Sequence, residues 1–276
     1  MSELNRRRFL GALAAATLAS VGAARYTLGE SLRPPAQALA AATLPAQSAE
    51  PDVAMAGLLP PPPPNMRVRL PGGGVLSRLP GQGDLLALTV DDGVNSDVVR
   101  MYTQFAKDTG VRLTYFVNGI YNSWTHNLAL LHPLVESGQI QLANHTWSHP
   151  DLTTVPNDRV AAEITRNHLF LERTYGIDAR PYIRPPYGNH NPTVDAVAAD
   201  LGYTVTTLWS GSLSDSSVVT GDYIVKMANQ YFTPQTIVIG HLNHLPVTQV
   251  YPQLVAVIRD RNLRTVTLND VFLKLL

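Results

Sequence analysis

The sequence contains no cysteine, so neither disulfides nor thiolate metal ligands can form. It also has no excess of either charge, because Lys plus Arg and Asp plus Glu each number 21 among 276 residues. A neutral chain lacks the basic surface that binding to nucleic acid requires. We therefore expect any metal to be held by His, Asp or Glu, and we do not expect nucleic acid as a partner.

The sequence also lacks an uninterrupted apolar run of the roughly 20 residues that a membrane helix needs. Its N-terminus instead joins Arg6-Arg7-Arg8-Phe9-Leu10 to a short stretch of small, weakly apolar residues. This arrangement is typical of a secretory signal, and Arg-Arg-x-Phe-Leu is similar to a twin-arginine signal, which exports folded proteins. An ordinary Sec signal and an uncleaved anchor are the alternatives. We expect residues 1–40 to direct export to the cell envelope or beyond, with the signal as the only membrane contact.

Residues 41–74 are rich in Ala, Pro and Gly and include an uninterrupted proline run over residues 60–64. They contain too few large apolar side chains to offset the entropy of ordering, and the proline run favours extended polyproline II. We therefore expect a stiff linker over 41–74 and a folded domain over 75–276. Docking of a partner onto the proline run is the alternative.

After residue 74, short apolar runs alternate with stretches of helical periodicity. The expected strands are 85–90, 111–117, 140–143, 182–183, 203–209, 236–239 and 264–266. Helices are expected between them, one capped by Ser96 and ended by Gly110, another begun by Asn191 and Pro192. About seven strands alternating with helices predict a mainly parallel α/β sheet. Periodicity does not separate an open doubly wound sheet from a barrel.

Polar clusters follow the carboxyl ends of these strands, where parallel α/β folds build their active sites. The clusters are Asp91-Asp92, residues 145–149, residues 184–187, residues 209–215 and His241. Taken singly, each has an ordinary structural explanation, such as an Asp-Gly turn or a pair of loop histidines. Their shared position predicts one functional site.

His145 and His149 are four residues apart, and on a helical turn this spacing places both imidazoles on one face. One carboxylate would complete a three-ligand metal site with a position left open. The adjacent carboxylates Asp91 and Asp92 repel each other unless a cation relieves them, so one could bind the metal and the other act as a base. Arg184 precedes two prolines that fix its backbone, and its guanidinium can brace a carboxylate.

In this order the clusters resemble the motifs of the polysaccharide deacetylases of carbohydrate esterase family four, which share the NodB homology domain. Residues 89–93 are similar to Thr-Phe-Asp-Asp-Gly, 145–149 to His-Ser/Thr-x-x-His, 184–187 to Arg-x-Pro-Tyr and 239–241 to Leu-x-His. The resemblance covers about residues 84–275. It implies a distorted, incomplete (β/α) barrel.

The resemblance also implies a hydrolase that removes N-acetyl groups from peptidoglycan N-acetylglucosamine or a chitin-like glycan and releases acetate. Asp92, His145 and His149 would bind a divalent metal, preferably Zn²⁺, which would carry the attacking water. Asp91 would be the general base and Arg184 would orient it.

On the same resemblance, His241 would be the general acid that protonates the leaving amine, paired with Asp215. Tyr187 would stabilise the oxyanion through its backbone N–H. Ile239 would line the pocket for the acetyl methyl group, and Trp209 is a further candidate to line the same pocket.

The fourth motif departs from the family, which tends to show Asp-x-x-Asp-Trp where residues 212–216 read Ser-Leu-Ser-Asp-Ser. Ser212 replaces the first acid, and Ser216 replaces the Trp that would wall the acetate pocket. Trp209 and Trp147 are the candidates to fill the gap. The alternatives are an O-acetyl glycan esterase, an inactive glycan-binding module, and a non-haem iron oxygenase, whose two-His-one-carboxylate set usually has a different spacing.

Overall fold

The computed structural model describes residues 58–70 and 74–273. The expected export signal, residues 1–40, lies outside this part of the chain and stays a prediction. Among the described residues, none of the helices combines the length and the apolar character that crossing a membrane requires.

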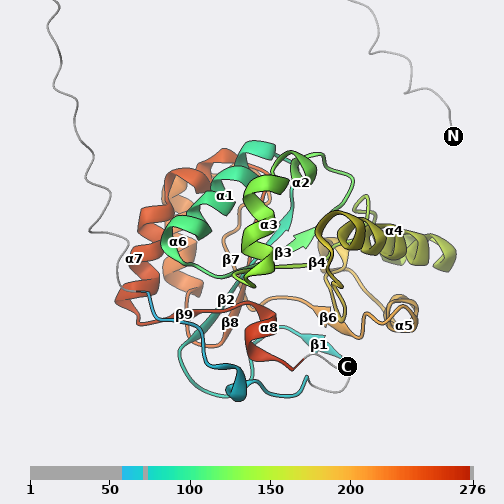
Figure 1. The fold of residues 1–276 in the computed structure, drawn as a ribbon, viewed down its shortest axis with the longest axis horizontal. Helices are drawn as coiled ribbons and strands as arrows, with labels where there is room; N and C mark the ends of the chain where they lie inside the picture. Colours follow the sequence, from blue (N-terminus) through green and yellow to red (C-terminus); the bar gives the residue numbers. More distant parts are fainter. Residues whose placement is uncertain (1–57, 71–73, 274–276) are drawn as a thin grey trace, which may run out of the picture. The chain divides into compact units, whose positions relative to one another are not determined.

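Parallel strands form the centre of the described domain (Figure 1). They are β1 Val75–Leu76, β2 Leu85–Asp92, β3 Leu113–Val117, β4 Ile140–Asn144, β5 Tyr182–Ile183, β6 Val205–Thr207, β7 Gly211–Ser212, β8 Thr236–His241 and β9 Arg264–Thr265. Their order is β1-β6-β5-β4-β3-β2-β8-β7, with β9 paired to β2, and every pairing between these strands is parallel.

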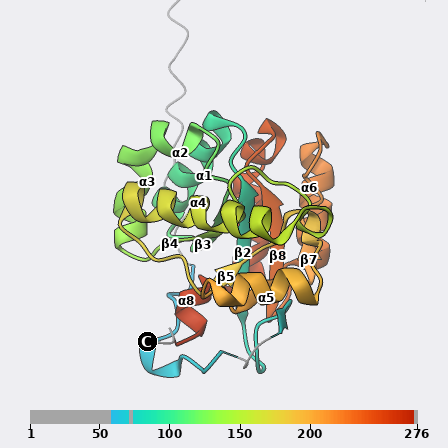
Figure 2. The same ribbon diagram turned by 90° about the vertical axis from the view of Figure 1, so that its right-hand side faces the viewer.

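Helices surround the strands, with α1, α6 and α7 on the left of Figure 1 and α4 and α5 on its right (Figures 1 and 2). Their bounds are α1 Ser96–Thr109, α2 Ser123–His126, α3 Leu128–Glu136, α4 Asn157–Tyr175, α5 Pro192–Asp200, α6 Gly221–Tyr231, α7 Tyr251–Asp260 and α8 Leu268–Val271. Asn95, and not Ser96, caps α1, because its side chain accepts hydrogen bonds from two backbone N–H groups of the first turn. Gly110, Asn191 and Pro192 take the predicted positions.

Strand β2 shows how the sheet separates two cores and carries a site. Leu86, Leu88 and Val90 belong to the outer core under the helices, whereas Ala87 belongs to a smaller inner core. Since side chains alternate along a strand, Thr89 and Asp91 share the inner face with Ala87. The inner face therefore changes from apolar to polar toward the carboxyl end of β2.

The barrel is incomplete, because β1 and β7 are the two end strands of the sheet. The segment after β1 reaches toward the other end of the sheet: Arg78 forms an antiparallel bridge with Thr236, and the N–H of Leu79 donates to the carbonyl of Gln235 at 2.9 Å. The expected distorted, incomplete (β/α) barrel is thereby confirmed, and an open doubly wound sheet is excluded. The described residues form nine strands instead of about seven, because the sequence did not predict the two-residue strands β1 and β7.

Residues 58–70 fall in the expected linker, yet they contact the domain. Leu58 packs against the outer core, Leu70 is buried, and Val68 forms a bridge with Phe272. Pro63 has the extended backbone that the proline run favours, with φ −65° and ψ 151°. Chain packing onto the domain therefore begins before residue 75.

Candidate active site

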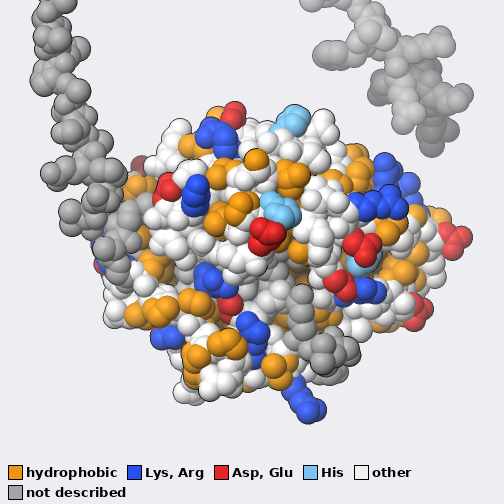
Figure 3. All heavy atoms as spheres, in the orientation of Figure 1, with side chains coloured by type: hydrophobic (Ala, Val, Ile, Leu, Met, Phe, Trp, Pro, Cys, Tyr) orange, Lys and Arg blue, Asp and Glu red, His pale blue; other side chains and the backbone are white. Residues whose placement is uncertain are grey.

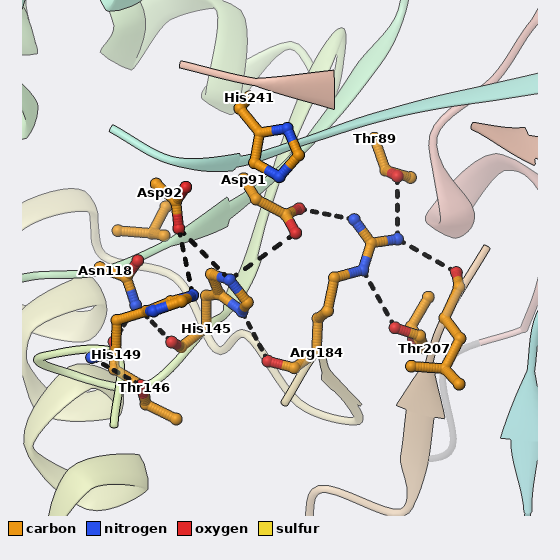
Figure 4. A network of polar contacts seen from close by, with 12 residues as sticks. Thr89, Asp91, Asp92, Asn118, His145, Thr146, His149, Arg184, Thr207 and His241 are labelled. Atoms are coloured by element: carbon orange, nitrogen blue, oxygen red, sulfur yellow. Dashed lines mark hydrogen bonds and ion pairs between the residues drawn. The ribbon is translucent and has the colours of Figure 1, made fainter. Parts of the chain in front are cut away.

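The metal-ligand candidates come together at the carboxyl end of β2 and in the loop after β4 (Figure 4). Oδ1 of Asp92 lies 3.4 Å from Nε2 of His145 and 3.5 Å from Nε2 of His149. One ligand atom from each of these residues lies within 4.8 Å of the others. The structure therefore unites the three predicted ligands in one group.

The expected helical turn over 145–149 is wrong, because these residues form an irregular loop. Thr146 and His149 have left-handed backbone, with φ of 69° and 60°. This conformation bends the loop, so the ring centres of His145 and His149 lie 4.9 Å apart in an edge-to-face arrangement. Glu163 on α4 holds the loop by accepting a hydrogen bond from the N–H of Ser148 at 2.7 Å. The bent loop, and not a helical turn, therefore brings His145 and His149 together.

The separations between Asp92 and each of the two histidines fit a tetrahedral zinc site. With Zn–N and Zn–O bonds of about 2.0–2.2 Å, two ligand atoms of a tetrahedron lie about 3.4 Å apart, as the Asp92 and histidine atoms do. Nδ1 of His145 donates to the carbonyl oxygen of Arg184 at 2.6 Å. The ring proton is therefore on Nδ1, and Nε2 has its lone pair free for a metal.

The electrostatics also suit a cation. Burial lowers the pKa of His149, the charge of His145 lowers it further, and the result is about 4 despite the opposing charges of Asp92 and Asp91. Burial raises the pKa of Asp92, but hydrogen bonding and the charges of the histidines outweigh it and hold this pKa well below its usual range. Near neutral pH the site therefore has a neutral His149 and a charged carboxylate, the forms that bind metal.

Asp91 is held apart from its neighbour by a buried cation. Nη1 of Arg184 donates to Oδ1 of Asp91 at 2.5 Å, and Nη2 donates to Thr89 Oγ1 at 2.8 Å. Arg184 is fully buried, and its Nε also donates to the carbonyl of Thr207 at 3.0 Å. The other oxygen of Asp91, Oδ2, faces Nε2 of His145 at 3.6 Å. Asp91 therefore presents one oxygen to the metal-ligand group.

His241 is paired with Asp215, as expected. Its Nδ1 lies 2.9 Å from Oδ1 of Asp215, and its backbone N–H donates to Oδ2. Burial lowers the pKa of His241, but the hydrogen bond and charge of Asp215, with the charges of Asp91 and Asp92, raise it above 6.5 overall. Asp215 is buried beside it. The pair can hold a proton near the cleft.

A cleft of about 500 Å³ joins these groups, and Tyr187, Ile239, Trp209, Ser212 and Ser216 line it. Trp147 lies elsewhere, under the guanidinium of Arg166 at 4.0 Å and edge to face with Phe170. Of the two tryptophans considered for the wall, the structure places Trp209 in the cleft. Tyr187 has left-handed backbone, with φ 61°, and its ring contacts that of His149. Arg184 and Asp215 lie behind the residues that they hold.

Sequence reasoning missed several residues of the site. Asn243 lines the cleft, and its side-chain N–H donates to Oδ2 of Asp92 at 2.6 Å. Asn118 is fully buried and donates to the carbonyls of His145 and Thr146. Neither belongs to a recognisable spacing, because each acts on residues far away in the chain. Only their position just after β8 and β3 could have suggested them.

The sequence profile described as polysaccharide deacetylase matches residues 79–206. Over these residues, slightly under half of the chain, the sequence is similar to the polysaccharide deacetylase family. Chitin deacetylase 1 of Cryptococcus neoformans var. grubii is 31% identical over 135 residues, which cover 49% of this chain and 27% of that protein. The chain thus spans less than a third of that relative's length.

In two further similar proteins, the match includes a larger share of the other protein's length. The peptidoglycan-N-acetylglucosamine deacetylase of Bacillus cereus is 27% identical over 195 residues, 68% of each chain. A solved peptidoglycan N-acetylglucosamine deacetylase has the same fold, with a TM-score of 0.65 at 24% identity over 72% of this chain and 93% of that one. The chain therefore shares the fold of that solved deacetylase, and its own structure adds the candidate Asp-His-His group.

Proposed function

We propose that this protein is a metal-dependent hydrolase that removes N-acetyl groups from a polysaccharide, either peptidoglycan N-acetylglucosamine or a chitin-like glycan. The observation that carries the proposal is the convergence of the metal-ligand group, Asp91 and His241 on one cleft. The choice of polymer is supported by the similarity to a chitin deacetylase and a peptidoglycan-N-acetylglucosamine deacetylase. Figure 3 shows basic and acidic side chains interspersed on one face of the molecule.

Asp92, His145 and His149 would hold the metal, for which zinc is the proposed identity. When bound, a divalent cation polarises the acetyl carbonyl and lowers the pKa of water. Asp91 takes the proton of the attacking water through Oδ2, the oxygen that faces His145. Arg184 holds the other oxygen and so fixes the direction of this base. With Oδ1 accepting from Arg184, Oδ2 is the oxygen of Asp91 that faces the metal-ligand group.

Collapse of the tetrahedral oxyanion breaks the C–N bond, and the departing nitrogen needs a proton. His241 supplies it from the cleft side of its ring, since Nδ1 is bound to Asp215. The backbone N–H of Tyr187 is the proposed donor to the oxyanion. Ile239 and Trp209 are proposed to contact the acetyl group. The products are acetate and a free amino sugar.

We place this activity outside the cytoplasm, on the strength of the basic and apolar N-terminus. Residues 41–57, with the segment 58–70 that packs on the domain, would set the distance between the export signal and the barrel. Fractionation of cells that produce the full chain tests this location. Recovery of the mature protein in the cytoplasm alone would contradict it.

The deciding experiment measures acetate release from N-acetylglucosamine oligomers, peptidoglycan and O-acetyl xylan by the metal-stripped and the zinc-loaded protein. We expect zinc-dependent release from an N-acetyl polymer and a loss of at least about 100-fold in kcat for Asp91→Asn, the usual size of a general-base contribution. Release from xylan alone would favour an O-acetyl esterase. Stoichiometric zinc binding without any release would favour a glycan-binding module, for which the serine at position 216 is the supporting observation.

A further inference from the structure

Asn243 lies two residues after β8 and lines the cleft, and its side chain contacts the carboxyl end of β2 and the residue just beyond it. Its Nδ2 donates to Oδ2 of Asp92 at 2.6 Å, and its Oδ1 accepts a hydrogen bond from the N–H of Val94 at 3.3 Å. A carboxylate can only accept and a backbone N–H can only donate, so the two partners fix the orientation of the amide. Asn243 thus grips Asp92 and the chain just beyond it at the same time.

The hydrogen bond from Asn243 determines which oxygen of Asp92 faces the metal-ligand group. Oδ2 is taken by Asn243, whereas Oδ1 lies 3.4 and 3.5 Å from the two histidine nitrogens. Rotation of the carboxylate about its Cβ–Cγ bond would break the short contact to Asn243. The side chain is therefore set to offer one oxygen.

The neighbouring carboxylates have partners of different charge. Asp91 is paired with the buried guanidinium of Arg184, whereas Asp92 accepts a hydrogen bond from the neutral amide of Asn243. A cationic partner would cancel the charge of Asp92 and weaken its attraction for a metal. An amide orients the carboxylate and leaves its charge to the metal.

We propose that Asn243 is a positioning residue that orients Asp92 for one-oxygen binding of the metal. This inference rests on the proposed function only in its use of the same metal-ligand group. Loss of a partner that orients a metal ligand typically weakens metal affinity 10- to 100-fold. Asn243→Leu keeps a similar side-chain volume and removes both hydrogen bonds, and Asn243→Ala serves as a second variant if Leu perturbs the fold.

The chain offers a matched control in Asn189. It also donates to a carboxylate in a loop beside the cleft, Oδ2 of Asp151 at 2.7 Å, but that carboxylate is not a ligand candidate. The readout is the Zn²⁺ dissociation constant of the full protein, measured by competition with a chromophoric chelator at constant pH. Thermal unfolding of the metal-stripped variants reports whether the fold is retained.

We expect Asn243→Leu to weaken zinc binding about 10- to 100-fold, with Asn189→Ala unchanged and the metal-free melting temperatures similar. Zinc affinity of folded Asn243→Leu or Asn243→Ala within twofold of the wild type would overturn the assignment. An equal loss in Asn189→Ala would do the same, because the effect would then not be specific to Asp92. A wild-type protein that binds zinc but releases no acetate would contradict the proposed function and leave the role of Asn243 testable by affinity alone.

Discussion

The Arg184→Met substitution tests whether the ion pair between buried Arg184 and Asp91 stabilises the folded protein. Arg184 is fully buried, and its side chain donates to Asp91, Thr89 and the carbonyls of Thr207 and Leu208. The guanidinium also lies 4.1 Å from the centre of the Phe116 ring. Met can fill most of this space but can donate to none of the acceptors.

The size of the effect follows from what remains after the change. Asp91 is 2% exposed, so without Arg184 its charge is buried with His145 as the nearest ionisable contact. Removing one member of a buried ion pair typically costs about 3–5 kcal/mol. Asp91→Asn in the same protein removes the stranded charge, so the double variant is expected to recover about 1–3 kcal/mol relative to additivity. Surface Arg180→Met, whose ion pair with Asp178 is about half exposed, should cost under about 1 kcal/mol.

The assay is urea unfolding of the metal-stripped proteins, followed by circular dichroism at neutral pH. Stripping matters because a bound metal stabilises the folded state and would mask the change. A loss under about 1 kcal/mol for Arg184→Met, below the range for a broken buried pair, would refute the reasoning. Strict additivity of the two substitutions would also refute it, since it would show that Arg184 and Asp91 do not interact energetically.

Two further predictions concern the acid and the cleft wall. Because the hydrogen bond to Asp215 helps raise the pKa of His241 and the acid must be protonated, activity should fall as pH rises through this raised pKa. Asp215→Asn should move that alkaline limb of kcat/KM to lower pH, and an unmoved limb in an active variant would exclude Asp215 as the cause. Ser216→Trp should narrow the cleft, so the preference for N-acetyl over N-propionyl substrates should rise about 10-fold or more, the usual cost of one misfit methylene. Identical preferences in the two proteins would show that Ser216 does not face the acyl group.

The elements that could be predicted from the sequence are those whose signal is local. The apolar run at 85–90 gave β2 almost to its observed end, and the polar residues after it gave Asp91 and Asp92. Strands β1 and β7 were not predicted, and both form only through partners elsewhere in the chain, β1 with residues 206–207 and β7 with residues 238–239. Asn243 escaped for the same reason: its partner Asp92 is 151 positions away. Local patterns identify which residues carry the chemistry, whereas long-range contacts decide what orients them.

Backbone conformation in the site shows this division most sharply. Asp92, Thr146, His149 and Tyr187 all have positive φ, yet none of them is a glycine. A left-handed backbone costs a residue with a Cβ atom about 1–2 kcal/mol, and although Asp and His adopt it more readily than most, residue type alone would not predict it at all four positions. Tertiary contacts must hold it in place, and Asn118 does so for Thr146 by donating to its carbonyl at 3.1 Å. Strained backbone conformations cluster at functional sites. Here they orient side chains from neighbouring loops toward the same metal-ligand group. The conformation that makes the metal-ligand group is therefore set by the barrel as a whole.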